Sequence, residues 1–420
     1  MRSALAVLFA AAAVVSCTSA TTPPSSAITT SRAPRAEATA DSTAAPSVAP
    51  EPIATATPSP TALELPRCRA PAGSTIRAFC PTGARIVLDP EISDVDAAAI
   101  VTQVTDDLAA VQREFEWTLR GTPQIDVYAT RDRFVAGLTG VFGYSRATAE
   151  FIADNSVAFF EPSQSRIAVF WEAVRDRRPI AAMRHELTHI VTLEACVPRC
   201  DLVPAWLNEG QARLAEALIP GADWRLMRVR FEAASMVTSN SLMPLTSLWT
   251  QAQWNAIGDW AGYYKYQEAA RATELMRTDI GDRAIPLLYS RIRSGIDVAR
   301  AYTSLTGKSF ESFISALPSR LQAIAGPGPG IVATTPGADG QGPSFLLYGF
   351  PPETHLALRL RARHSDETQD IAVSPQGAYF GSIDDGYAPG AYVITATANG
   401  ITVLTTVTKR GGRTLQTRGD

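Results

Sequence analysis

Two histidines and a glutamate lie within one short segment near the middle of the 420-residue chain. The segment reads His185-Glu186-Leu187-Thr188-His189, which is the pattern H-E-x-x-H. On a helix, residues four positions apart project from the same face, so both imidazoles can bind one metal ion. In zinc sites with this pattern the glutamate acts as a base toward metal-bound water. The segment therefore predicts His185 and His189 as ligands of one zinc ion per chain, and Glu186 as a catalytic base.

The residues around this segment predict a helix with the histidines on its polar face. Pro179 precedes the segment, and proline is favoured in the first turn of a helix. An apolar stripe then recurs at helical spacing, formed by Met183, Leu187, Ile190 and Val191. On a helical wheel both histidines fall nearly opposite this stripe, which argues against histidines that merely fill the core. We expect Arg184 and the arginine-containing run 175–178 to form a solvated entrance to the helix.

A third ligand is expected on a second helix that follows Pro204. Catalytic zinc takes three protein ligands and keeps one position open for water, and two histidines with one glutamate are a known set. Glu209 lies off the packing face of this helix, which consists of Leu207, Gln211, Leu214 and Leu218. Glu209 would therefore complete the set. The two remaining histidines, His355 and His364, are expected on the surface of a C-terminal domain.

The motif and the stretch Pro204-Ala205-Trp206-Leu207-Asn208-Glu209-Gly210 together resemble the gluzincin metallopeptidases. The likeness is to peptidase MA-like domains, which are distant relatives of the aminopeptidase N group, and it covers about residues 84–320. It implies that His185, His189 and Glu209 bind zinc, that Glu186 is the general base and proton shuttle, and that the core is thermolysin-like. The spacing from His189 to Glu209 is one residue longer than in common aminopeptidases. The G-x-M-E-N substrate motif of that group is not found, so N-terminal exopeptidase activity is not implied.

The same resemblance implies a tyrosine that helps zinc to stabilise the oxyanion. Tyr263, Tyr264 and Tyr266 are the candidates, and the family's pattern favours Tyr266. The alternative is that these aromatic rings only pack in the core. The resemblance also places the strand Arg166–Phe170 at an edge of the sheet, where a peptide substrate could add as a further strand.

The order of the expected elements indicates an α+β catalytic domain over residues 66–324, with a small mixed sheet and a helical subdomain. Strands are expected at 85–88, 124–128, 156–160 and 166–170, and helices at 94–117, 131–138 and throughout 223–320. A Pro/Gly-rich linker is expected at 325–342. Six short alternating runs over 343–410 then predict a small Ig-like β-sandwich, followed by a disordered tail at 411–420.

The first 65 residues indicate export. Residues 1–17 have a charge, a short apolar run and small residues, and end at Cys17 in a sequence that resembles a bacterial lipobox. The alternative is an ordinary signal peptide with an incidental cysteine. Residues 18–65 are rich in Ser, Thr, Ala and Pro and are expected to be a disordered tether. We therefore expect a lipoprotein, lipidated at Cys17, on the outer face of the cytoplasmic membrane or elsewhere in the envelope.

The other four cysteines form two local pairs, Cys68 with Cys80 and Cys196 with Cys200. In an exported protein both pairs are disulfide candidates. A second metal site at Cys196 and Cys200 is the alternative, but no further cysteine or nearby histidine would complete it.

The composition excludes one class of partner. The net charge is −3 and no basic block is present, so no nucleic-acid partner is expected. The leading hypothesis is a membrane-anchored zinc peptidase that acts on peptides or proteins. A catalytically silent envelope binding protein on the same fold is a second hypothesis, although it would have no need of Glu186. A zinc hydrolase of a non-peptide substrate is the third.

Overall fold

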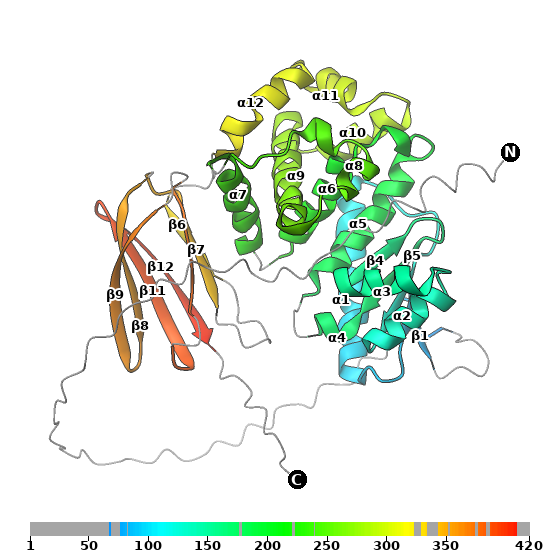
Figure 1. Cartoon of the computed structure of the whole chain (residues 1–420), viewed down its shortest axis with the longest axis horizontal. Coiled ribbons are helices and arrows are strands. Elements are labelled where there is room, and N and C mark those ends of the chain that lie inside the picture. Colours follow the sequence, from blue (N-terminus) through cyan, green and yellow to red (C-terminus); the bar gives the residue numbers. More distant parts are fainter. Residues whose placement is uncertain are drawn as a thin grey trace, which may run out of the picture.

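The computed structural model describes residues 67–68, 76–81, 83–175, 179–220, 223–238, 240–322, 329–333, 343–351, 353–373, 377–383 and 387–409. These residues form an α+β body and a separate β-sandwich beside it (Figure 1). The predicted signal segment 1–17, the tether 18–65 and the tail 411–420 lie outside the described residues. Among the helices described, none is long and apolar enough to span a membrane.

A five-stranded sheet organises the body. Its strand order is β1-β2-β3-β5-β4, where β2, β3 and β5 run parallel and the two outer strands are antiparallel to their neighbours. The strands are β1 Arg77–Phe79, β2 Arg85–Leu88, β3 Gln124–Tyr128, β4 Ala158–Glu161 and β5 Arg166–Phe170. The β1 strand was not predicted from the sequence.

The expectation that Arg166–Phe170 forms the edge strand is wrong. The β5 strand lies between β3 and β4, and β4 occupies the edge. The reason is a long-range pairing: β5 pairs in parallel with β3, and Arg166 on β5 also forms an ion pair with the buried Asp126 on β3, with Nη2 of Arg166 3.0 Å from Oδ1 of Asp126. The hairpin from β4 to β5 therefore places its second strand inside the sheet.

Helices cover both faces of the sheet. On one face lie α1 (Asp94–Phe115) and α5 (Ala181–Cys196), which share the main core with the strands. On the other face lie α2 (Arg131–Gly140) and α3 (Arg146–Asn155), which pack on the sheet through a smaller core that includes Phe134 and Phe159. The α3 helix and the short α4 (Trp171–Val174) were not predicted from the sequence.

The second half of the body is largely helical. Its elements are α6 (Ala205–Ala217), α7 (Asp223–Thr238), α8 (Gln251–Asn255), α9 (Asp259–Ile280), α10 (Ala284–Arg293), α11 (Val298–Thr306), α12 (Phe310–Gln322) and the 3-10 turns η1 (Cys200–Leu202) and η2 (Leu245–Leu248). We had expected helices throughout 223–320, and this expectation is wrong for the connection from α7 to α9. The described part of that connection holds only η2 and α8. In this connection Leu245, Leu248 and Trp254 are buried, so it belongs to the core.

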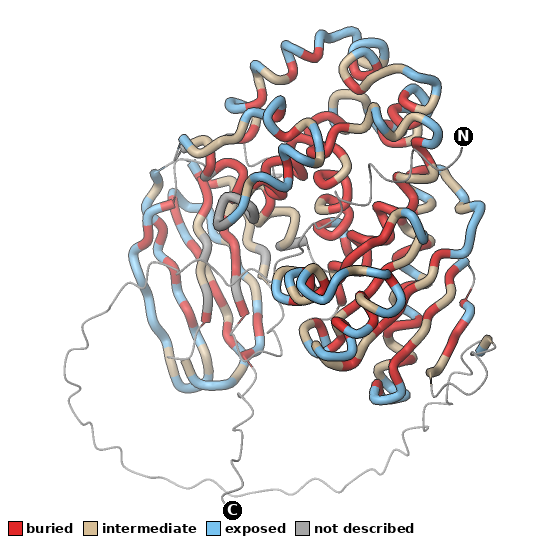
Figure 2. Tube along the Cα trace, turned by 45° about the vertical axis from the view of Figure 1, so that its right-hand side comes forward, coloured by how far each residue is buried: buried red, intermediate tan, exposed pale blue. Residues whose placement is uncertain are grey.

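The C-terminal strands form two sheets that enclose one core. The order is β10-β7-β6 in one sheet and β12-β11-β8-β9 in the other. The strands are β6 Gly330–Ala333, β7 Ser344–Tyr348, β8 His355–Ala362, β9 Ser365–Ala372, β10 Tyr379–Ser382, β11 Gly390–Ala398 and β12 Ile401–Lys409. Along the sandwich strands β8 and β11, buried positions alternate with more exposed ones (Figure 2), as expected when one sheet face is solvated. The prediction that 325–342 is only a linker is wrong, because β6 lies within this range and pairs with β7.

The sandwich packs directly against the body through α7 (Figure 1). On β7, Phe345 and Leu347 point into the sandwich core, whereas Leu346 joins a cluster with Ala234 of α7. Both faces of this strand are therefore covered, which explains its uninterrupted apolar sequence.

Candidate metal centre

The motif helix α5 is buried on nearly all sides. It begins at Ala181, two residues after the predicted start at Pro179. The apolar stripe packs in the core as expected, but the histidine face is also covered: His185 is 1% exposed, Glu186 3% and His189 9%. The polar face is therefore packed against other helices, with α6 a principal neighbour, rather than presented to solvent.

Arg184 does not belong to a solvated helix entrance, so that expectation is wrong. Its side chain is buried, and Nε donates to Oδ1 of Asp107 on α1 over 2.8 Å. Gln103 of α1 accepts from the backbone N–H of Ile180 and donates to its carbonyl, at 3.0 and 2.8 Å. These contacts hold the start of α5 against α1. Of the expected entrance, Arg175 is exposed and residues 176–178 lie outside the described part of the chain.

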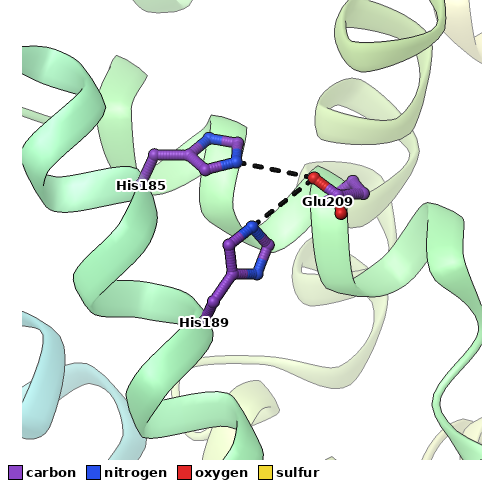
Figure 3. A group of neighbouring side chains, drawn as sticks. All are labelled: His185, His189 and Glu209. Carbon is purple, nitrogen blue, oxygen red and sulfur yellow. Dashed lines mark ion pairs between the residues drawn. The ribbon is translucent and has the colours of Figure 1, made fainter. Parts of the chain in front are cut away.

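The three predicted ligands converge (Figure 3). The Nε2 atoms of His185 and His189 each lie 3.5 Å from Oε2 of Glu209, and one ligand atom from each residue lies within 4.8 Å of the others. Tetrahedral ligands about 2.1 Å from a zinc ion would be about 3.4 Å apart. Oε2 of Glu209 is buried and makes no hydrogen bond of ordinary geometry with any described residue. The donor types and their spacing therefore fit a zinc ion.

Two side chains of α6 contact the other nitrogen of each imidazole. Nδ1 of His185 lies 2.9 Å from Oε1 of Glu216 as an ion-pair contact without ordinary hydrogen-bond geometry, and Glu216 also forms an ion pair with Arg213. Nδ1 of His189 lies 3.2 Å from Oδ1 of Asn208. Oxygen acceptors at Nδ1 favour the tautomer that protonates Nδ1 and leaves the Nε2 lone pair for a metal.

Asn208 and Glu216 were not singled out from the sequence. Asn208 directly precedes Glu209, and Glu216 follows it by seven residues, which is two helical turns on the same side of α6. That spacing was the available signal for Glu216. It could not be used without knowing that α6 lies beside His185.

Mutual electrostatics strongly shift the ionisation of these groups. Burial raises the pKa of Glu209, but His189 and His185 outweigh it and bring the pKa to about 2. Glu216 behaves in the same way: burial raises its pKa, and Arg213 and His185 lower it to about 2. Burial lowers the pKa of His185, whereas Glu209 and Glu216 raise it to about 10. Without a metal, His185 is therefore a cation held between two carboxylates at neutral pH.

Of the candidate tyrosines, the structure places Tyr266 beside the ligands. Its buried ring lies with its centroid 6.1 Å from that of His185. Tyr264 is half-buried, and its pKa is raised by burial and by the charge of Glu232 on α7. The side chain of Tyr263 lies outside the described part of the structure.

The edge strand β4 also borders the ligands. The ring of Phe160 stacks on that of His189, with centroids 6.4 Å apart and planes inclined by 12°. Among the described residues, β4 pairs with a strand on one side only, which makes it the edge strand of the sheet.

Both predicted cysteine pairs are disulfide-bonded in the structure. The Cα–Cα distances are 5.5 Å for Cys68–Cys80 and 4.8 Å for Cys196–Cys200. The second bridge closes the turn between α5 and η1, and it leaves no thiolates for the alternative metal site. Cys17 lies outside the described residues.

No protein-family model matches the chain. No curated protein matches it either. Among solved structures, it is similar to an aminopeptidase A of Legionella pneumophila in complex with aspartic acid, with 12% identical residues and a TM-score of 0.36. The match covers 77% of this chain and 36% of that one, so the chain spans about a third of its length. A similarity of this size does not establish a shared fold or activity.

Proposed function

We propose that the chain is a zinc-dependent peptidase of the gluzincin type, anchored outside the cytoplasm. The observation that carries the proposal is the convergence of His185, His189 and Glu209, with Glu186 buried beside them. Two neutral imidazoles and one carboxylate form a ligand set with a single negative charge, and this set leaves a coordination position for water.

Glu186 has the properties of a proton-transfer group. When bound, zinc supplies a Lewis acid that polarises the scissile carbonyl and makes a water molecule more acidic. Burial raises the pKa of Glu186, although the adjacent His185 and His189 oppose this shift. A carboxylate with a raised pKa is suited to accept the proton of the attacking water and to return it to the leaving amine. In this proposal Tyr266 donates a hydrogen bond to the developing oxyanion.

The edge position of β4 supports a peptide as the substrate. An extended peptide that adds to β4 forms main-chain hydrogen bonds independently of its sequence. Phe160 on this strand contacts His189, so such a peptide lies next to the ligands. This edge, rather than β5, is the proposed substrate-binding strand.

The proposed location rests on the N-terminal sequence. The lipobox-like segment ending at Cys17 supports lipidation and export, and residues 18–65 would tether the body to the membrane. The two disulfides are consistent with an oxidising compartment.

Metal analysis combined with a Glu186→Gln variant tests the proposal. We expect the wild type to contain about one zinc per chain, the variant to retain it, and only the wild type to cleave a peptide library. Absence of zinc from the wild type would contradict zinc chemistry of any kind. Zinc without peptide cleavage would favour a non-peptide substrate or a silent binding protein, and a screen of ester and amide substrates separates these two.

A further inference from the structure

One of the three lysines of this chain is buried next to the candidate centre. The chain has 35 arginines, and its lysines are Lys265, Lys308 and Lys409. Lys265 is 5% exposed, whereas the side chain of Lys308 is 59% exposed. A buried ammonium is costly unless its donors are used. The surroundings of Lys265 must therefore compensate for the loss of water.

Two backbone carbonyls and two aromatic rings surround the Lys265 ammonium. Nζ donates to the carbonyl of Trp254 over 2.7 Å and to that of Ile257 over 2.9 Å. The ring centroids of Trp254 and Tyr266 lie 4.8 and 5.8 Å from Nζ, within the range of cation–π attraction. Lys265 thus binds the end of α8 to α9.

The contacts continue from this cation to the candidate ligands. The Trp254 ring packs edge-on against Tyr266, with centroids 4.9 Å apart and planes at 90°. Tyr266 in turn faces His185. Burial lowers the pKa of Lys265 to about 8, while the charge of Glu209 opposes this shift. The Lys265 side chain therefore contacts both the Trp254 ring, which packs against Tyr266, and the end of α8, which contains Trp254.

We propose that Lys265 is a positioning residue that keeps Tyr266 oriented toward the metal ligands. The inference rests on the proposed role of Tyr266 in the zinc peptidase. Lysine suits the position because its compact ammonium directs donors at two carbonyls and still leaves room for two rings. The planar fork of arginine, which the chain uses almost everywhere else, is larger and has a different donor geometry.

The response of the Tyr266 side chain to added zinc tests the inference without requiring catalysis. In the full chain labelled with 3-fluorotyrosine, a Tyr266→Phe variant identifies the 19F signal of Tyr266. We expect zinc to shift this signal in the wild type. In Lys265→Met the shift should be much smaller, although zinc still binds at one site. The matched control Lys308→Met should behave as the wild type does.

Kinetics provide the second readout. We expect Lys265→Met to lower kcat by roughly tenfold or more with little change in KM, and not beyond the ~10²-fold loss expected for Tyr266→Phe. The double variant Lys265→Met/Tyr266→Phe should lose no more kcat than Tyr266→Phe alone. With Lys265→Arg, part of the kcat that Lys265→Met loses should be restored.

The outcomes separate the two proposals. A wild type that binds no zinc contradicts the proposed function. The positioning role is overturned if Lys265→Met changes neither kcat nor the zinc-induced shift of the Tyr266 19F signal. If Lys265→Met does not fold, Trp254→Phe replaces it, because this variant keeps the carbonyl bonded to Lys265 and reduces the ring contact with Tyr266. An unchanged zinc-induced shift in that variant also overturns the inference.

Discussion

The Nδ1 atom of His185 lies 2.9 Å from Oε1 of Glu216, while Nε2 of the same ring lies 3.5 Å from Oε2 of Glu209. Two carboxylates on one side of α6 thus lie next to the two nitrogens of one imidazole. The first is a candidate ligand, and the second is placed to pair with Nδ1 and to orient the ring. The position of the His185 lone pair therefore depends on how α6 lies against α5.

Removal of Glu216 should weaken zinc binding. We expect Glu216→Ala to reduce zinc affinity by about 10–100-fold, because the ring loses the partner that orients it. Glu216→Gln should have a smaller effect, since it keeps an acceptor oxygen but loses the charge. Competition with a chromophoric chelator measures the affinity. Glu311→Gln, at an exposed position of α12, is the control and should match the wild type. Equal affinities of Glu216→Ala and the wild type would exclude this role.

Zinc binding should release a proton. In the metal-free protein Glu209 and Glu216 hold the pKa of His185 at about 10 against the effect of burial, so its ring is protonated at pH 7.5. A metal needs the neutral imidazole, and about one proton must therefore leave on binding. Calorimetric titrations in buffers of different ionisation enthalpy give this number. A binding enthalpy independent of the buffer would show that His185 is already neutral.

Gly210 allows α6 and α9 to approach each other directly after Glu209. A Cβ at this position would collide with the carbonyl oxygen of Ala269 and with Oγ1 of Thr273. We expect Gly210→Ala to cost about 1–3 kcal/mol of unfolding free energy, as overpacking does, and to weaken zinc binding. Urea unfolding of the metal-free protein measures the first effect. Gly140→Ala is the control, because a Cβ there meets no atom within 4 Å, and it should not be destabilising.

Glu268 should make the folded state less stable at alkaline pH. Burial raises the pKa of its carboxyl to about 8, although the N–H of Met243 donates to it over 3.0 Å. Between the ordinary value of 4.5 and about 8, the folded state holds a proton that the unfolded state has lost. Unfolding free energy should therefore fall as pH rises through this window and level off above it.

The variant Glu268→Gln tests this dependence, because its amide keeps an acceptor for Met243 and cannot ionise. We expect its stability, relative to the wild type, to increase from pH 5 to pH 8. The comparison uses metal-free protein in chelator, since zinc binding itself depends on pH. Parallel stability curves for the two proteins would show that Glu268 does not carry the effect.

Short-range patterns in the sequence were sufficient to predict the three residues that converge in the candidate centre. His185 and His189 share a face because a helix repeats every 3.6 residues, and a third ligand on the next helix followed from what zinc requires. Most helices and strands were predicted for the same reason, since their periodicity is local. The disulfide pairs are also close in sequence, and few other pairings were plausible.

Only the tertiary structure decided what surrounds those ligands. The periodicity of one helix shows which residues share a face, but not what covers it. Arg184 is 77 residues from Asp107, so its burial could not be read from its own helix. The same holds for the edge position of β4, which depends on the pairing of β5 with β3. Contacts distant in sequence also brought Glu216 and Tyr266 to His185, because each depends on how two separately formed helices pack.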